Sequence, residues 1–163
     1  MNSNFELEIK QDQLDLFQRS LLYRFEEAKE PIQAAMGEKF FEIVRLNFGE
    51  FGVDRPIEWA PLSNRPPYFY AQRVGREYAT LFVTGRLEAG VKFEADEEKA
   101  RVYISDADVP YATDHQYGNP EKFLPARPYF PIDSNGQVTS FTNEQVMLAA
   151  QTETARLLGG GLL

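Results

Sequence analysis

Two runs of alternating apolar and polar residues, joined by a short acidic turn, constrain the fold of this chain more than any other part of its sequence. The first run covers residues 87–95 and the second covers residues 100–105, and the turn between them contains Asp96, Glu97 and Glu98. Successive side chains of a β-strand point to opposite faces, so a period of two marks a strand with one buried face. The pattern therefore predicts an antiparallel hairpin made of these two runs.

The first third of the chain has the periodicity of helices. Apolar residues recur at steps of three and four over residues 14–28 and again over residues 32–44. This spacing predicts amphipathic helices, the second of which ends near Asn47. Because Pro lacks a backbone donor and disfavours the helical conformation in the residue before it, Pro31 predicts a break or kink between the two stripes. The alternation over residues 5–9 predicts a short strand ahead of these helices.

The C-terminal part of the chain predicts one more helix and one further strand. Thr142 and Gln145 have the spacing of a capping box, which places the start of a helix at Thr142, and the glycines at 159–161 end it. Segregated strands and helices predict a single α+β domain over residues 1–163, in which an antiparallel β-sheet with a central hairpin packs against a broken N-terminal helical segment and a C-terminal helix. Residues 123–132 form a candidate further strand, with buried side chains expected at Phe123, Tyr129, Phe130 and Ile132.

The composition excludes several classes of functional site. The chain has 163 residues, no Cys and a single His, His115, which excludes disulfides, thiolate metal sites, Cys nucleophiles and multi-His zinc sites. It contains no Gly-rich loop that ends in Lys and Ser or Thr, so a Walker-type phosphate site is excluded as well. We expect no cofactor and no metal. The lack of a long apolar segment and of a signal-peptide pattern predicts a protein made in the cytosol, with no membrane partner.

His115 is the one natural general base, and it leaves two hypotheses open. With Asp114 beside it and Ser105 or Ser63 elsewhere, it could form the triad of a small hydrolase. Alternatively, it ties a Pro-rich loop to neighbouring backbone carbonyls. We favour the second interpretation, because Ser and Asp are common residues and the sequence supplies no geometry for a triad.

Charge is distributed unevenly along the chain, whose 25 acidic and 17 basic residues give a net charge of −8. Residues 51–86 carry a net charge of +2 with Arg as their only basic residue, whereas residues 87–122 carry −5. Arg forms bidentate pairs and stacks on aromatic rings, so the Arg and aromatic residues at 55–80 resemble a protein-binding hot spot. An ordered loop with aromatic side chains packed beneath it would explain this segment equally well. An acidic chain of this kind does not look like a general binder of duplex DNA.

Four short elements occur in a fixed order along the chain. A Trp-x-Pro-Leu-Ser element is followed by a Thr-Gly-x-Leu element just before the predicted hairpin, then by a Tyr-Ala…His-Gln-x-Gly element and a Pro-Ala-Arg-Pro element that leads to Phe130. This order resembles the virion morphogenesis, or tail-completion, proteins of tailed bacteriophages and prophages. The positions that carry the resemblance are Trp59, Pro61, Leu62, Ser63, Thr84, Gly85, Leu87, Tyr111, Ala112, His115, Gln116, Gly118, Pro125, Ala126, Arg127, Pro128 and Phe130.

The resemblance implies a structural role and no catalysis. It implies a subunit of a homo-oligomeric ring at the head–tail joint, with the tail tube and head-connector proteins as partners, and the usual symmetry of tails suggests six copies. DNA would pass through the ring without specific binding, and the protein would reside in the virion after assembly in the host cytoplasm. Hairpin edges or terminal segments are expected to pair across subunits. The alternatives are a small hydrolase centred on His115 and a non-phage protein-binding module that uses residues 55–80.

The resemblance makes the matched residues fold-defining or interface-defining, and their chemistry indicates how. Gly85 and Gly118 permit backbone turns that a Cβ would obstruct. Pro125 and Pro128 hold Arg127 in a stiff extended segment, from which its guanidinium can bond carbonyls or a carboxylate. The net negative charge suits a ring that must not hold DNA, because an acidic lumen repels phosphate.

Overall fold

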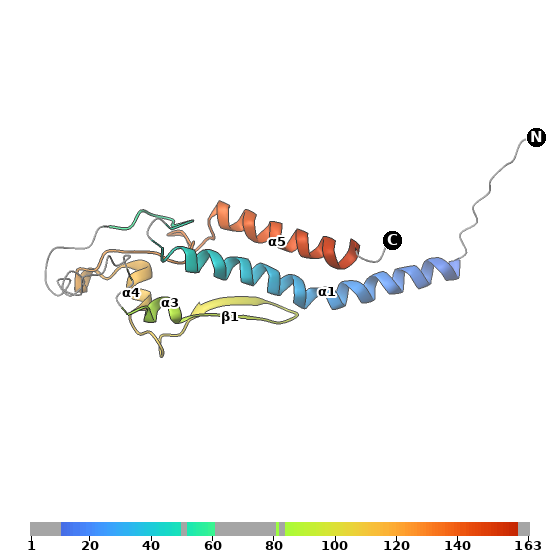
Figure 1. Ribbon diagram of the computed structural model, residues 1–163, viewed down its shortest axis with the longest axis horizontal. Coiled ribbons are helices and arrows are strands. Elements are labelled where there is room, and N and C mark those ends of the chain that lie inside the picture. Colours follow the sequence, from blue (N-terminus) through green and yellow to red (C-terminus); the bar gives the residue numbers. More distant parts are fainter. Residues whose placement is uncertain (1–10, 50–51, 61–80, 82–83, 160–163) are drawn as a thin grey trace, which may run out of the picture.

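The α+β fold predicted from the sequence is confirmed by a computed structural model, which describes residues 11–49, 52–60, 81 and 84–159. A long helix, α1 (Gln11–Leu46), forms the axis of the molecule. The hairpin of β1 (Val91–Ala95) and β2 (Ala100–Ile104) packs against α1, and so does the C-terminal helix α5 (Ser140–Gly159). Figure 1 shows the hairpin and α5 on opposite sides of α1. The strand predicted at residues 5–9 lies outside the described residues.

The predicted hairpin is confirmed, but its first strand is shorter than the sequence pattern suggests. The register pairs Val91 with Ile104 and Ala95 with Ala100. The Asp96 carboxylate accepts the backbone N–H groups of residues 98 and 99 at 2.8 and 2.9 Å, which fixes the turn. Residues 86–89 are not strand; they form the short helix α3 (Arg86–Ala89), because β2 ends at Ile104 and residues before Val91 have no partner in it.

The predicted further strand at residues 123–132 is wrong. The sheet of the described residues has two strands, and this segment makes two isolated bridges, Asn119 with Leu124 and Ile132 with Val138. Three prolines in the segment lack the N–H groups that a ladder requires. Tyr129 is buried as predicted, and Phe130 and Ile132 are half-buried.

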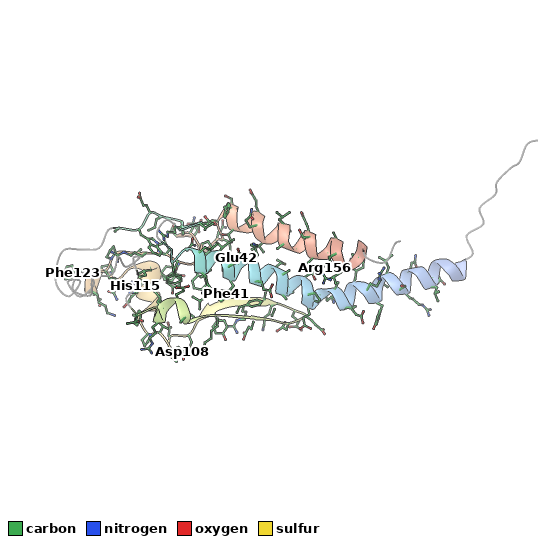
Figure 2. The ribbon with its side chains drawn as sticks, in the orientation of Figure 1. Phe41, Glu42, Asp108, His115, Phe123 and Arg156 are labelled. Atoms are coloured by element: carbon green, nitrogen blue, oxygen red, sulfur yellow. The ribbon has the colours of Figure 1, made fainter. Side chains whose placement is uncertain are left out.

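The predicted burial of Phe123 is also wrong, since its side chain is 92% exposed. Phe123 follows the 3₁₀ turn η1 (Pro120–Lys122) and donates its N–H to the carbonyl of Pro120 at 3.1 Å. Its backbone has a φ of 53°, in the left-handed region. The turn thus directs the ring outward, and Figure 2 shows Phe123 at one end of the molecule, far from Arg156 of α5.

The two helices predicted around Pro31 are one continuous helix. Residue 31 lies inside α1, and Figure 1 shows that the helix changes direction partway along its length, which fits the kink that a Pro produces. At the other end of the chain, α5 begins at Ser140, so Thr142 is not its cap. The N–H of Thr142 instead points at the hydroxyl of Thr139 (3.4 Å) and the carboxylate of Asp54 (3.2 Å), which cap the helix.

The hydrophobic core lies at the C-terminal end of α1. It contains Val44, Phe48, Trp59, Leu87, Val91, Val109, Ala112 and Tyr129. The N-terminal half of α1 is different: Leu16 is 74% exposed, and Leu22, Tyr23 and Phe25 are exposed too. Of the apolar stripe predicted over residues 14–28, Ala28 is buried and Phe25 is not. One end of the helix is therefore anchored in the core while the other presents apolar side chains to solvent.

Candidate functional site

The side chain of Gln116 joins two of the four sequence elements. The helix α4 (Ala112–Tyr117) carries it, and it is 6% exposed. Its Oε1 accepts the N–H groups of Tyr129 (3.1 Å) and Phe130 (3.0 Å), and its Nε2 donates to the carbonyl of Phe130 at 3.3 Å. An amide that both accepts and donates replaces the ladder that the Pro-rich segment cannot form.

Trp59 and Arg127 connect the first element to the last. The indole Nε1–H of Trp59 donates to the carbonyl of Pro128 at 2.8 Å, and Nε of Arg127 donates to the carbonyl of Ala60 at 3.0 Å. Arg127 is 3% exposed. The expectation that its guanidinium bonds a carbonyl is confirmed, and this bond lies within the subunit. We call the contacts of Trp59, Gln116, Arg127 and Tyr129 the motif junction.

Backbone geometry explains why glycines occur at residues 85 and 118. Gly118 ends α4 with a φ of 79°, and a Cβ there would lie 2.8 Å from the backbone nitrogen of Ala126. Gly85 precedes α3 with a φ of 72°. Both observations confirm the turns expected at these glycines. The hydroxyl of Thr84 accepts the N–H of Arg86 at 3.3 Å, and Leu87 reaches the core.

The remaining matched residues have different positions. Ala112 is buried, and its carbonyl accepts the hydroxyl of Tyr129 at 3.2 Å. Tyr111 packs edge-on against His115, with ring centroids 5.7 Å apart. Pro128 is buried and Ala126 is half-buried, whereas Pro125 is exposed. Three residues of the first element, Pro61, Leu62 and Ser63, lie outside the described residues.

Sequence reasoning missed a buried amide at the end of α1. The Nδ2 of Asn47 donates to the carbonyls of Asp54 (2.8 Å) and Tyr129 (3.0 Å), and its Oδ1 accepts the N–H groups of Val53 (3.0 Å) and Asp54 (2.8 Å). The Asp54 carboxylate accepts the Thr142 hydroxyl at 2.5 Å. Asn47 and Asp54 thus attach α5 and the motif junction to α1. The sequence feature that could have indicated this buried amide was the position of an Asn at the predicted end of a helix.

The contacts of Arg55 bear on the hypothesis that the Arg and aromatic residues at 55–80 bind another protein. Its guanidinium carbon lies 3.6 Å from the centre of the Trp59 ring, and its nitrogens donate to the carbonyl of Asn47 at 2.6 and 3.0 Å. This Arg therefore stabilises its own subunit by stacking and by capping a helix end. Residues 61–80, which contain the other Arg and aromatic residues of that segment, lie outside the described residues.

The environment of His115 gives no support to a catalytic triad. Burial and the charge of Arg127 hold the pKa of His115 below its ordinary value, so its imidazole is neutral at pH 7. Among the described residues, the buried Nδ1 of His115 has no hydrogen-bond partner, so it contacts neither a carboxylate nor a backbone carbonyl. The expected contact between this ring and loop carbonyls is therefore not made at Nδ1. The main chain of His115 bonds the loop instead, because its carbonyl accepts the N–H of Arg127 at 2.7 Å.

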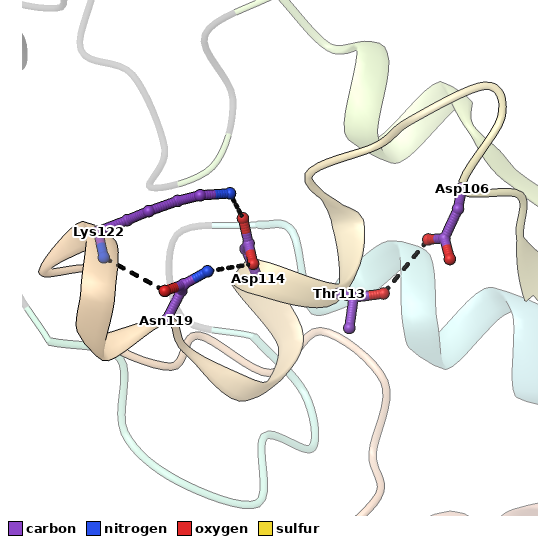
Figure 3. Close-up of polar contacts among 5 residues, drawn as sticks. All are labelled: Asp106, Thr113, Asp114, Asn119 and Lys122. Atoms are coloured by element: carbon purple, nitrogen blue, oxygen red, sulfur yellow. Dashed lines mark hydrogen bonds and ion pairs between the residues drawn. The ribbon is translucent and has the colours of Figure 1, made fainter.

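A polar cluster holds the turn that follows α4. Figure 3 shows Asp114 accepting from Nδ2 of Asn119 (2.8 Å) and Nζ of Lys122 (2.5 Å). These bonds lower the pKa of Asp114, the one to Lys122 most. In the same view, the hydroxyl of Thr113 donates to Asp106 at 3.2 Å. The carboxylates near His115 thus serve the loop structure.

Neither a metal site nor a membrane span is found in the part of the chain that the structure describes. No three His, Asp or Glu side chains in these ranges lie together in a way that could hold a metal ion. No helix in the same ranges is long and apolar enough to cross a bilayer.

Comparisons with known proteins return no match for this chain, whether against protein-family models, curated proteins or solved structures. The resemblance of the four sequence elements to tail-completion proteins therefore stays a prediction.

Proposed function

We propose that the protein is a non-catalytic structural subunit of a phage or prophage particle, which assembles as a ring at the head–tail joint. The observation that carries the proposal is the ordered set of four sequence elements between residues 59 and 130. The described residues of the first, third and fourth elements contact one another, as Trp59 bonds Pro128 and Gln116 bonds Phe130. If the four elements define the fold of a protein family, their residues are expected to contact one another in this way.

Exposed apolar side chains on several elements also support an assembling subunit. Leu22 and Tyr23 of α1, Phe141 and Leu148 of α5, and Phe123 of the turn after α4 are all exposed. Exposed apolar side chains that are adjacent, such as Leu22 and Tyr23, are found at protein contact sites when they form a contiguous patch. The hydrolase alternative finds no comparable support, because the imidazole of His115 is packed against Tyr111 and has no partner at Nδ1 in the described residues.

The oligomeric state tests this proposal. Light scattering and negative-stain microscopy of the purified protein, alone and mixed with tail tubes, should reveal rings of uniform subunit number. A protein that stays monomeric at every concentration and never binds to tail tubes would contradict the proposal. Turnover of a substrate that the His115→Ala variant loses while it keeps its fold would favour the hydrolase instead.

A further inference from the structure

The outer edge of β2 borders a groove, lined by apolar and polar side chains, that no element of the described residues fills. Two adjoining hollows of about 340 and 500 Å³ share Phe40, Val102 and Tyr103 in their linings. One hollow extends to Ile104 and Ile132, and the other extends past Met36 to Val146 of α5. Together they form what we call the edge groove, to which α1 contributes Gln33, Met36, Gly37 and Phe40.

The strand beside the edge groove has a free backbone edge. β2 pairs with β1 on one side, and the sheet of the described residues contains no third strand. Unpaired N–H and C=O groups along such an edge are a template for one more strand. Strand addition of this kind takes its affinity from main-chain hydrogen bonds and its specificity from pockets for alternate side chains. An open strand edge supplies the main-chain hydrogen bonds, and the groove beside it supplies pockets that include apolar side chains.

We propose that residues 4–10 of a second copy of this chain occupy the edge groove as a third strand. Phe5, Leu7 and Ile9 alternate with polar residues, the pattern of a strand with one buried face. On the hairpin, Val102 and Ile104 are half-buried, and Phe93 contacts Phe41 of α1 at a centroid distance of 6.2 Å. A third strand in the same sheet would therefore bury its apolar side chains over α1, beside Phe40 and Met36.

The charges of the two strands are complementary. Glu6 and Glu8 would lie on the outer face of the added strand, next to the outward side chains of Arg101 and Tyr103. Arg101 is 3.1 Å from Glu94 on its other side, and a guanidinium has donors enough for two carboxylates. Cross-strand pairs of opposite charge stabilise a sheet.

Chain length requires that the strand come from another copy. The nearest residue of the edge groove on α1 is Gln33, which lies about 33 Å from Gln11 at a helical rise of about 1.5 Å per residue. Residues 4–10 span at most about 24 Å when fully extended. The segment cannot reach the groove of its own subunit, but it can enter that of a neighbour. Repeated head to tail, this contact closes a ring or continues as a filament.

Disulfide cross-linking tests the contact, because the chain contains no Cys of its own. Two single variants, Glu8→Cys and Tyr103→Cys, are mixed and oxidised, and the same is done with Glu6→Cys in place of Glu8→Cys. At least one mixture should yield a disulfide-linked dimer that contains both variants. The matched control is Lys92→Cys, which has an exposed side chain on the same face of the hairpin but on β1. An equal dimer yield with Lys92→Cys would overturn the assignment to β2.

The strand exchange rests on the proposed ring, and deletion of residues 2–10 tests the exchange separately from ring formation. Loss of the assembly, with an unchanged thermal unfolding curve of the helical body, is expected. A deletion variant that still forms rings would overturn the strand exchange and leave the proposed function intact. Cross-linking that gives filaments or dimers, without any ring in the intact protein, would support the exchange and contradict the proposed function.

Discussion

At the scale of single residues, the molecule depends on polar side chains that satisfy backbone groups. Asn47 bonds the backbone of three residues, Val53, Asp54 and Tyr129, and Gln116 bonds that of two. Loop segments rich in Pro and Gly cannot pair in a ladder, so their buried N–H and C=O groups need such partners. The side-chain amides of Asn47 and Gln116 thus bond loop N–H and C=O groups that a neighbouring strand would bond in a larger sheet.

Asn47→Ala should therefore destabilise the protein strongly. The substitution leaves two N–H groups and two carbonyls without the partners they have in the native structure, and a cost of about 3 kcal/mol in the free energy of unfolding is expected. Urea unfolding followed by circular dichroism measures it. Asn135→Ala is the matched control, because Asn135 is exposed and the Asp133 carboxylate accepts its backbone N–H. Equal costs for the two variants would contradict the role of Asn47.

His115 gives the unfolding free energy a pH dependence of predictable sign. Its pKa is lowered in the native state by burial and by Arg127, so below about pH 6.5 the unfolded chain binds a proton that the native chain binds less well. The stabilising contribution is therefore complete above the unfolded pKa and is lost as pH falls through the native pKa.

The comparison of the intact protein with His115→Gln between pH 7.5 and pH 5 checks this sign. The difference in unfolding free energy should move in favour of the variant as the pH falls. Because the chain has a single His, NMR titration of the imidazole reports its pKa without overlap. A native pKa at or above the ordinary value would contradict the prediction.

At the scale of elements, the turn after α4 shows how a Gly can be required by space as well as by conformation. Gly118 and Gly136 both have positive φ, 79° and 78°. A Cβ at residue 118 would meet the backbone of Ala126 at 2.8 Å, whereas one at residue 136 would meet no atom within 4 Å. A positive φ is thus common to the two sites, whereas Gly118 also has a ψ of 163°, a combination that is essentially confined to Gly, and it has the steric clash.

Gly118→Ala should cost about 3 kcal/mol or more, and Gly136→Ala about 1 kcal/mol, in the free energy of unfolding. The difference between the two variants reports the Gly-only conformation of residue 118 together with its contact with the Pro-Ala-Arg-Pro segment. Thermal or urea unfolding measures both. If Gly136→Ala is as damaging as Gly118→Ala, positive φ alone accounts for the cost, and neither the ψ of residue 118 nor the close approach to Ala126 matters.

The two halves of α1 should differ in local stability. In the C-terminal half, Val44 belongs to the core, whereas Leu16 and Leu22 in the N-terminal half are exposed. Helical stability in proteins comes mainly from packing of an apolar face. Hydrogen exchange in the monomer, followed by mass spectrometry, should show faster exchange for residues 15–27 than for residues 36–46. Uniform protection along the helix would contradict this.

Local patterns predicted the elements well, and the errors came from long-range packing in α1 and from turn and Pro geometry around residues 123–132. The hairpin was predictable because its alternation and its turn are adjacent in sequence. At Pro31 the sequence left a break and a kink both open, and the structure shows one continuous helix that packs against α5 and the hairpin. The burial of Phe123 was predicted from its hydrophobicity alone. In the structure, its left-handed backbone conformation directs the ring into solvent.

The candidate site was predictable as a set of residues but not as a set of contacts. The sequence identified Gln116 and Arg127 through the resemblance, and the structure places both in the motif junction. Nothing in the sequence indicated that Asn47 would bond residue 129, because their separation along the chain carries no local signal. The first element was only partly testable, since residues 61–63 lie outside the described residues.

At the scale of the whole molecule, the net charge bears on the proposed passage of DNA through a ring. The chain carries −8, and residues 87–122, which contain the hairpin, carry −5. The side chains of Glu94, Glu97 and Glu98 are exposed around the hairpin turn. Proteins bind duplex DNA through cationic side chains that release counterions, and an acidic surface opposes this. A ring of such subunits would let DNA pass without holding it.

The purified assembly should therefore not bind duplex DNA, even at low salt, in a fluorescence anisotropy titration. The double variant Glu97→Lys/Glu98→Lys is the control, because it reverses two exposed charges on the hairpin turn without touching the core. If the turn lies near passing DNA, this variant should gain weak binding that weakens as salt is raised, since each new phosphate contact releases counterions. Tight, salt-sensitive binding by the unmodified assembly would contradict the passive role, because DNA held by its phosphates cannot slide freely through a ring.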